Sequence, residues 1–457
     1  MRYHRTSRLH DVALSLHCYR RELKGIFILS VLLAALGSSY SDLYAAGIGD
    51  TVIRVYDHKG VDSPNRVFSR TVLFPSMSKQ CSKVMLTVTL DCPRGGCDPW
   101  DRGASIWITN PSDTTLYHYY SDYFADTNKK EIARFITPYG KNISYQFDVT
   151  DFRPLLADSA RVMIFVTTYT GKGYGYLLTM DFEFTAGVPS IEPYRVVKLW
   201  GGSPEYGNPA NPIENFLKPL VLTADPQMEF ARARVIITGH GQGNTDNAGE
   251  FARKWHQVKV DETVRYGRYL WRDDCGRSSA GEQYGTWTGA RAGFCPGEKV
   301  DVWDVDLTPF ITAGKNYTID YDVEPYENRC RPGVVPCPCP SCEYDDLGHN
   351  KPIFHIESYV IYYRVPQKNP DFSFADKAFT VAIAGAQGRT LVIKPNLAEQ
   401  TDIQVVLLNG GGEEIFRQLR HRVSIAPFEV SLATTPGSYL LSITGGGKAW
   451  QKKLKIQ

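Results

Sequence analysis

The stretch Val84-Met-Leu-Thr-Val-Thr-Leu90 places Val or Leu at every second position, with Thr87 and Thr89 at two of the positions between them. A period of two is typical of a half-buried antiparallel strand. The segment Leu178–Phe184 has the same alternation, and clusters of Gly, Pro, Asn and Asp separate such runs. Further strand-like runs cover residues 104–109, 162–168, 234–238, 254–260 and 353–365. No long stretch has a helical period of 3.6, so the sequence predicts an all-β fold of sandwiches or barrels.

The chain is too long for one hydrophobic core, because single cores stop growing at roughly 250 to 300 residues. Residues 187–215 are rich in Pro, Gly and Asn with little alternation, and residues 366–371 form a second polar connector. Beyond that connector, Phe379–Gln457 has the pattern of a compact β unit. We expect four parts: a leader at 1–46, then domains at 47–188, 189–368 and 369–457.

The charge balance is nearly neutral, with 51 Lys and Arg against 49 Asp and Glu. No basic block interleaved with aromatics follows the leader, which excludes nucleic acid as an expected partner. Residues 2–24 are basic, residues 25–37 are apolar, and small residues follow, which is typical of a secretory signal peptide. The apolar run is shorter than the roughly 20 residues of a membrane-spanning helix, although an uncleaved anchor remains the alternative. We expect the mature protein to be soluble outside the cytoplasm.

Export favours disulfides over free thiols. Without Cys18 of the leader the cysteine count is odd, and Cys81 has the least obvious partner. Four cysteines are closely spaced at Cys330, Cys337, Cys339 and Cys342. They could hold zinc, but the intervening prolines and the exported setting favour two disulfides, whose pairing the sequence leaves open.

The loop after the first quoted strand is a candidate catalytic segment. Cys92 and Cys97 enclose Pro-Arg-Gly-Gly, a turn-forming sequence. A disulfide there would fix the direction of the following Asp-Pro-Trp-Asp-Arg segment, which ends with Asp101 and Arg102. The positive charge of Arg102 would favour the ionised form that Asp101 needs as a general base. The alternative is a stapled hairpin with solvated charges.

A second carboxylate, Glu250, follows the glycine-rich segment Thr238–Gly243 and precedes a predicted strand. Glycine-rich loops let the backbone approach a ligand closely, although Glu250 alone could be a solvated loop residue. His240 and His256 lack the paired spacing of metal ligands. We therefore predict no metal and no cofactor. No nucleophile elbow or phosphate-binding glycine loop is present.

Four motifs occur in order along the chain: Cys97-Asp-Pro-Trp-Asp-Arg102, Ile132-Ala-Arg-Phe-Ile-Thr-Pro-Tyr139, Phe147-Asp-Val-Thr-Asp-Phe152 and Arg291-Ala-Gly-Phe-Cys-Pro-Gly297. Together they resemble the peptide-N-glycosidase F family of peptide-N4-(N-acetyl-β-glucosaminyl)asparagine amidases. The resemblance runs from about Gly47 to Val365. It implies two adjacent jelly-roll β-sandwiches with the site in the cleft between them, and the remaining residues predict a small C-terminal β-sandwich.

The resemblance also implies the roles of the site residues. Asp101 matches the family's primary catalytic aspartate and Glu250 its essential glutamate, while Arg102 and Arg291 match the flanking arginines. The implied reaction hydrolyses the amide that joins asparagine to the first N-acetylglucosamine, with Asp101 deprotonating water and Glu250 orienting water and sugar. Cys275 and Cys295 match a bridge of the family. The predicted substrate-binding residues are Trp100, Arg102, Thr167, Tyr169, His240 and Arg291.

The chain departs from the family pattern at several positions. Thr167 stands where the family has a third carboxylate, and His240 where it has a tryptophan. Ala248 and Ala252 replace a disulfide pair around the glutamate. We expect the smaller Thr167 to open space beside the first sugar, which would admit a core substituent such as fucose.

The C-terminal segments Pro436–Ile443 and Lys452–Ile456 resemble the sorting domains of the type IX secretion route, with an accessory domain as the alternative. The expected partners are N-glycosylated proteins or peptides and, through this tail, the secretion machinery; we expect a monomer. A glycan-binding protein without turnover is the alternative function. The joint presence of two acids and two arginines at the matched positions favours the enzyme.

Overall fold

The computed structural model describes residues 50–331, 351–366, 374–384, 390–410, 413–433, 435–446 and 448–456. Strands dominate these residues, and the α-helix among them, α2, spans only Tyr120–Ala125. The all-β prediction is therefore confirmed. The predicted signal peptide at 1–46 lies outside the described residues. Short 3-10 turns are η1 (Ser63–Asn65), η2 (Thr150–Leu155), η3 (Ile213–Asn215), η4 (Thr245–Asn247) and η5 (Cys275–Arg277).

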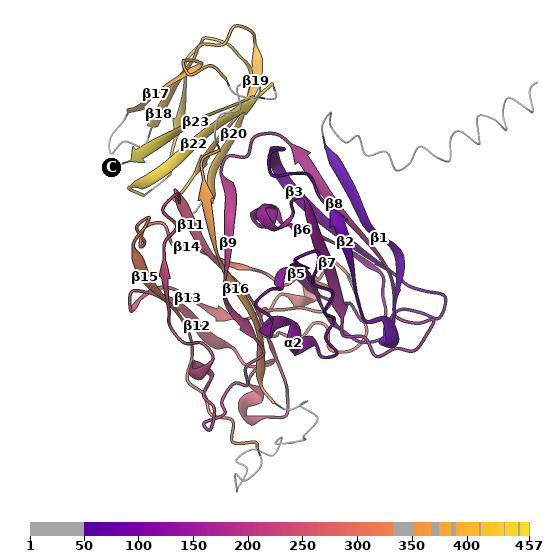
Figure 1. Cartoon of the computed structure of the whole chain (residues 1–457). Helices are drawn as coiled ribbons and strands as arrows, with labels where there is room; N and C mark the ends of the chain where they lie inside the picture. Colours follow the sequence, from indigo (N-terminus) through magenta and orange to yellow (C-terminus); the bar gives the residue numbers. More distant parts are fainter. Residues whose placement is uncertain are drawn as a thin grey trace, which may run out of the picture. The chain divides into compact units, whose positions relative to one another are not determined.

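The first sandwich consists of two antiparallel four-stranded sheets (Figure 1). One sheet has the order β1 (Thr51–Val61), β8 (Tyr176–Ala186), β3 (Cys81–Asp91) and β6 (Ile143–Asp148). The other has the order β2 (Val67–Leu73), β7 (Ser159–Val166), β4 (Gly103–Thr109) and β5 (Lys130–Ile136). The quoted stretch Val84–Leu90 lies in β3, and the side chains of Val84, Leu86, Val88 and Leu90 are fully buried. Alternation thus directs one face of β3 into the core between the sheets.

The second sandwich also has two four-stranded sheets. One has the order β14 (Trp303–Asp306), β11 (Phe230–His240), β16 (Ile353–Arg364) and β9 (Glu192–Gly202). The other has the order β10 (Leu220–Thr223), β15 (Asn316–Val323), β12 (Lys254–Val260) and β13 (Thr263–Leu270). Its separate core includes Val235, Ile237, Val258 and Ile319.

Both sandwiches follow one topology when their strands are numbered from the start of each. The orders are 1-8-3-6 in one sheet and 2-7-4-5 in the other, in both cases. Eight antiparallel strands in two sheets joined in this way form a jelly roll. The connection between the third and fourth strands is residues 92–102 in the first sandwich and residues 241–253 in the second. These equivalent loops contain Asp101 and Glu250, respectively.

A third, smaller sandwich follows, with its own core. Its sheets have the orders β17 (Phe379–Ala384), β18 (Thr390–Pro395), β21 (Phe428–Ser431) and β20 (Glu414–Val423), β19 (Thr401–Leu408), β22 (Gly437–Gly445), β23 (Lys448–Ile456).

The edge strand β5 of the first sandwich is covered by a segment of the second. Ile136 and Val300 donate backbone hydrogen bonds to Glu298 and Arg134, at 2.9 and 2.8 Å. An uncovered edge would present unpaired backbone groups. The pairing joins the two jelly rolls next to the end of β5, where the chain continues toward Tyr139.

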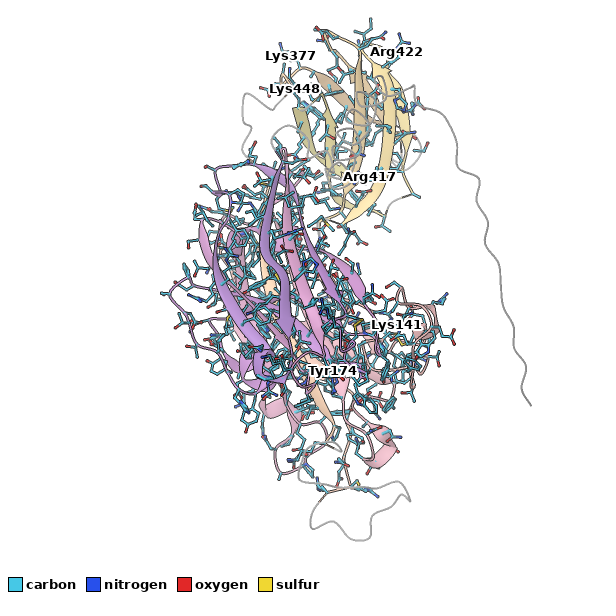
Figure 2. All side chains as sticks on the ribbon, turned by 90° about the vertical axis from the view of Figure 1, so that its right-hand side faces the viewer. Lys141, Tyr174, Lys377, Arg417, Arg422 and Lys448 are labelled. Atoms are coloured by element: carbon cyan, nitrogen blue, oxygen red, sulfur yellow. A yellow bond between two sulfur atoms is a disulfide. The ribbon has the colours of Figure 1, made fainter. Side chains whose placement is uncertain are left out.

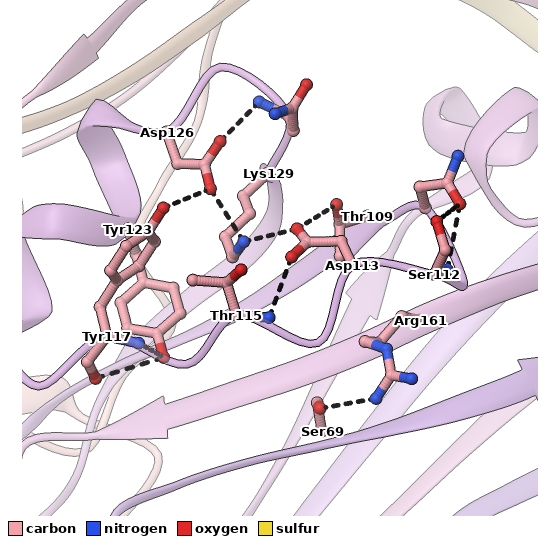
Figure 3. Close-up of polar contacts among 12 residues, drawn as sticks. Ser69, Thr109, Ser112, Asp113, Thr115, Tyr117, Tyr123, Asp126, Lys129 and Arg161 are labelled. Atoms are coloured by element: carbon pink, nitrogen blue, oxygen red, sulfur yellow. Dashed lines mark hydrogen bonds and ion pairs between the residues drawn. The ribbon is translucent and has the colours of Figure 1, made fainter.

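The β4–β5 connection is organised by a buried lysine. The Lys129 ammonium donates to Asp113 at 2.6 Å and to Asp126 at 2.8 Å, with its side chain fully buried (Figure 3). Two carboxylates compensate the cost of burying this charge. The helix α2 lies within this connection, and its Phe124 ring stacks on His355 of the second sandwich at 5.0 Å between centroids. The connection therefore contributes to the contact between the two jelly rolls.

Candidate active site

The disulfide predicted between Cys92 and Cys97 is present at the start of the first candidate loop. Gly96 closes the turn with φ of +112° and donates to the Pro93 carbonyl at 2.9 Å. Gly95 donates to the Gly173 carbonyl at 3.1 Å, and a Cβ at Gly95 would lie 2.5 Å from that oxygen. The absence of a side chain at Gly95 thus lets the loop pack directly on its neighbour.

Asp98 fixes the geometry of the residues that follow. Its fully buried carboxylate accepts hydrogen bonds from the Trp100 amide at 2.9 Å, the Arg102 Nε at 2.9 Å and the Thr168 hydroxyl at 2.6 Å. The structure therefore pairs Arg102 directly with Asp98, which the sequence reasoning did not anticipate. The Arg102 charge still lowers the pKa of Asp101, as the smallest of several effects.

Asp101 is partly buried at the end of this loop. Burial raises the pKa of its carboxyl, while a hydrogen bond from Tyr139 and the charge of Arg291 oppose that rise. Burial and the Asp101 charge raise the pKa of Tyr139 to about 12, so Tyr139 remains a hydrogen-bond donor near neutral pH. The sequence reasoning missed Tyr139 as a site residue, although it ends one of the quoted motifs.

Glu250 enters the same site from the second sandwich. Burial raises the pKa of Glu250 to about 7, with the charge of Arg291 opposing and that of Asp101 adding to the rise. Because each acid senses Arg291 and Glu250 senses Asp101, the two carboxylates lie within electrostatic reach of one another. The preceding Gly249 has φ of +92° and a Cβ there would clash with the His240 carbonyl, so glycine is required before the acid.

Arg291 is held in a fixed orientation. Its Nη1 donates to the carbonyls of Thr286 and Gly289 at 3.0 and 2.8 Å, and its Nη2 donates to the Thr286 hydroxyl at 3.0 Å. Its Nε lies 3.4 Å from Glu250 Oε1. Three of the guanidinium contacts therefore go to its own loop, and the remaining edge faces the acid. The predicted disulfide Cys275–Cys295 is present at the base of this loop.

The predicted substrate-binding aromatics border Asp101. Trp100 is 59% exposed, with its ring centroid 6.2 Å from that of Tyr139. Tyr169 is 66% exposed and packs under the Arg102 guanidinium at 5.2 Å. Tyr174 packs against the glycine turn of the disulfide loop and is labelled on the face shown in Figure 2. Exposed aromatic rings next to charged groups are typical of a surface that binds sugars or peptides.

Thr167 lies beside the same loop. Its hydroxyl donates to the Gly103 carbonyl at 3.0 Å, so its short side chain is tied to the backbone immediately after Arg102. The structure thus places Thr167 beside Gly103, two residues after Asp101.

His240 faces a different set of residues. Its Nε2 lies 2.8 Å from the Thr238 hydroxyl, and its ring stacks on Phe294 and contacts His355. Burial and the charge of Arg134 lower its pKa to about 3, so the ring is neutral. Its carbonyl lies against the glutamate loop, where a Cβ at Gly249 would be 2.3 Å from it.

The contact between the sandwiches contains a buried polar network that the sequence reasoning did not identify. Arg134 forms paired hydrogen bonds with Glu131 at 2.8 and 2.6 Å and reaches across to Thr238 and the His355 carbonyl. Glu357 pairs with Lys198 at 3.0 Å, and burial raises its pKa to about 8. This network holds the two halves of the site together.

The structure describes only some of the remaining cysteines. Cys81 is a buried free thiol, and Cys330 is disulfide-bonded. The pairings of Cys337, Cys339 and Cys342 fall outside the described residues. Within the described ranges, no group of three His, Cys, Asp or Glu side chains is arranged to hold a metal ion. That part of the chain also contains no helix long and apolar enough to cross a membrane.

Comparisons with known proteins match both jelly rolls. A family model described as peptide-N-glycosidase F, N terminal, matches residues 58–184, and its C-terminal counterpart matches residues 213–361; together they cover more than half of the chain. The peptide-N(4)-(N-acetyl-beta-D-glucosaminyl)asparagine amidase F of Elizabethkingia miricola is 26% identical over 272 residues, which are 57% of this chain and 72% of the relative.

Solved structures share the fold. A crystal structure of a peptide-N(4)-(N-acetyl-beta-D-glucosaminyl)asparagine amidase has a TM-score of 0.53 at 21% identity, covering 70% of this chain and 98% of that one. The structure of PNGase F, a glycosylasparaginase from Flavobacterium meningosepticum, has a TM-score of 0.51 at 21% identity, covering 69% and 96% of the two chains.

Proposed function

Because the chain belongs to the peptide-N-glycosidase F family, we propose that it hydrolyses the amide bond between asparagine and the first N-acetylglucosamine of N-linked glycans. Its substrates are N-glycosylated proteins or peptides. The observation that carries the proposal is the convergence of Asp101 and Glu250, from equivalent loops of two jelly rolls, on one arginine.

In the proposed reaction, Asp101 accepts a proton from water as the water oxygen attacks the amide carbonyl carbon. The carbon–nitrogen bond then breaks, the nitrogen takes up a proton, and a glycosylamine leaves while asparagine becomes aspartate. Tyr139 orients the Asp101 carboxylate through its hydrogen bond. Glu250, with a pKa of about 7, is protonated in about half of the molecules at neutral pH and can donate a hydrogen bond to sugar or water.

The two arginines have different parts in this scheme. Three hydrogen bonds from the Nη atoms of Arg291 go to Thr286 and Gly289, and its Nε lies 3.4 Å from Glu250, which supports a role of Arg291 in positioning Glu250. Arg102 uses its Nε for Asp98, and its Nη atoms have no hydrogen-bond partner among the described residues. Arg102 is therefore the residue that stabilises negative charge on the amide oxygen.

Incubation with a glycopeptide in heavy-oxygen water tests this function. The amidase releases free glycan and incorporates the label into the new aspartate. Asp101→Asn is expected to abolish release with the fold intact, while Asp91→Asn, at the end of strand β3, leaves it unchanged. A glycopeptide that stays bound and intact would instead favour the glycan-binding alternative.

The fucose hypothesis belongs to the same site. The Thr167 side chain is short and is hydrogen-bonded to the Gly103 carbonyl, which supports the hypothesis of open space beside the first sugar. Thr167→Glu is expected to lower activity on core-fucosylated glycopeptides at least tenfold relative to plain ones. An unchanged ratio of the two activities would refute the hypothesis.

The substrate class also fits an exported protein. We propose that residues 1–46 are removed as a signal peptide and that 47–188 and 189–368 are the catalytic domains. Residues 369–457 direct type IX secretion. The secreted enzyme is a monomer. The separate core of the third sandwich supports a unit distinct from the catalytic domains. Deletion of residues 437–457 is expected to retain the enzyme inside the cell, as measured by deglycosylating activity in the medium.

A further inference from the structure

A cavity of about 520 Å³ lies between the two jelly rolls and includes none of the residues assigned to the amidase site. The first sandwich contributes Ile132–Arg134 of β5 and the end of β6. The second contributes parts of β11 and β13 and the segment Lys299–Val302. A cavity of this size can hold a monosaccharide.

Cationic side chains exceed anionic ones in the lining, and two of the cations are already neutralised. Arg134 is paired with Glu131, and Arg234 donates to Asp304 at 2.7 Å. Neither is available to bind a further anion.

Arg268 is the largely buried cation of the lining that has no ion-pair partner among the described residues. Its Nε is buried without a hydrogen-bond partner, and its guanidinium lies 4.8 Å from the Trp303 ring centroid. No carboxylate within the described ranges forms an ion pair with it, because nearby Asp301 pairs with Arg272 at 2.9 Å and Asp304 pairs with Arg234. Burial lowers the pKa of Arg268, and the charges of Asp301 and Asp304 oppose that shift only in part. A largely buried guanidinium without a paired anion is unfavourable.

Lys299, which forms no ion pair with any residue that the structure describes, adds a second cation at an exposed position of the lining. The neighbouring apolar lining includes Ile132, Phe147, Ile236 and Val300. The lining also contains two carboxylates, but Asp148 lies 3.9 Å from Lys83 and Asp301 lies 2.9 Å from Arg272. The two cations and the apolar lining therefore suit a ligand that carries a carboxylate on a compact body with apolar faces. A sugar acid has this combination, since its ring presents C–H groups beside its polar substituents.

We propose that this cavity is a second binding site, which takes a carboxylate-bearing sugar with Arg268 as the principal anion ligand and Lys299 as an auxiliary one. The site is separate from the amidase centre and goes beyond the proposed hydrolysis. Because its lining comes from both jelly rolls, an occupant also stabilises their contact.

Calorimetric titration of the full chain with D-glucuronate and with D-glucose tests the site. Glucuronate is expected to bind at one equivalent, and neutral glucose at least tenfold more weakly, because only the acid pairs with Arg268. Equal binding of the two sugars, or no binding of glucuronate, would overturn the proposal. Sulfate is expected to compete weakly; sulfate binding as tight as that of glucuronate would overturn the assignment to a sugar acid.

The matched variants are Arg268→Gln and Arg265→Gln on the same strand, β13. Arg265 is exposed three positions earlier, with its guanidinium over the Phe310 ring, and does not line the cavity. Arg268→Gln is expected to weaken glucuronate at least tenfold and Arg265→Gln to leave it unchanged. Lys299→Gln, at an exposed position that does not threaten folding, is expected to weaken it about threefold. Unchanged affinity in both Arg268→Gln and Lys299→Gln would contradict the site.

Discussion

At the scale of single residues, the site depends on Asp98, a carboxylate that is fully buried and does not face the solvent. Asp98 gathers the Trp100 amide, the Arg102 guanidinium and the Thr168 hydroxyl, and so sets where Asp101 points. Sequence adjacency suggested that Arg102 serves Asp101. The fold instead pairs Arg102 with the residue four positions earlier.

Asp98→Asn tests this positioning role. Arg102 and Thr168 donate to one oxygen of Asp98 and the Trp100 amide donates to the other. An asparagine replaces one of these acceptors by an NH2 group and removes the negative charge that pairs with Arg102, so the loop loses its fixed geometry. We expect kcat/KM to fall by about 10²-fold, mainly through kcat, because misplacement of catalytic groups by about 1 Å has effects of that size. Asp91→Asn serves as the control, and a loss confined to KM would argue against misplacement of the catalytic groups.

The pH dependence of stability reports the environment of Glu250. Its pKa is about 7 in the folded protein and about 4.3 in an unfolded chain. Because the pKa is raised in the folded protein, the contribution of protonated Glu250 to stability is fully present below pH 4. That contribution is lost as the pH rises through 7. Glu250→Gln should therefore increase the free energy of unfolding at pH 8 by about 3 to 4 kcal/mol and leave it unchanged at pH 4.

Urea denaturation at the two pH values measures this difference. The exposed Glu183→Gln serves as the control and should show no such contrast. Equal effects of Glu250→Gln at both pH values would mean that Glu250 is not buried as described.

At the scale of elements, the alternating pattern predicted the strands well because each jelly-roll strand buries one face. The run predicted at 254–260 is β12 itself, and Val84–Leu90 lies within β3. Strand order was not readable from the pattern, since alternation shows which face is buried but not which strand lies alongside. The same limit hid Tyr139 and Asp98, whose roles depend on contacts distant in sequence or on burial. The disulfides were easier to foresee, one from loop length and the other from family resemblance.

The two disulfides should differ in their effects. In the chain-entropy model, removal of Cys92–Cys97, five residues apart, costs about 2 kcal/mol, and removal of Cys275–Cys295, twenty residues apart, costs about 3 kcal/mol. The Cys92→Ser/Cys97→Ser variant should nevertheless lose more activity, because its loop carries Asp101. Thermal unfolding and glycopeptide turnover measure the two effects; a larger activity loss in the Cys275→Ser/Cys295→Ser variant would contradict the assignment of roles.

At the scale of the whole molecule, the active site exists only while the two jelly rolls keep their contact. Arg134, with 2% exposure, connects Glu131 of its own strand with Thr238 and His355 of the second sandwich. A buried ion pair that loses one partner leaves an uncompensated charge behind.

Arg134→Met should therefore lower the free energy of unfolding by about 3 to 5 kcal/mol, measured by urea denaturation. The Glu131→Gln/Arg134→Met double variant should recover part of this loss, because no buried charge remains. A double variant less stable than Arg134→Met would show that the ion pair is not the source of the effect.

The repeated strand order has a consequence for how this chemistry can change. Each acid lies on the connection between the third and fourth strands of its own jelly roll, in which Cys97 and Ala248 are the residues buried in the two cores. Insertions or exchanges in one such loop alter half of the catalytic centre and leave all sheets and the partner loop intact. The two jelly rolls thus act as one scaffold with two separate catalytic loops, and substrate range can be redesigned one loop at a time.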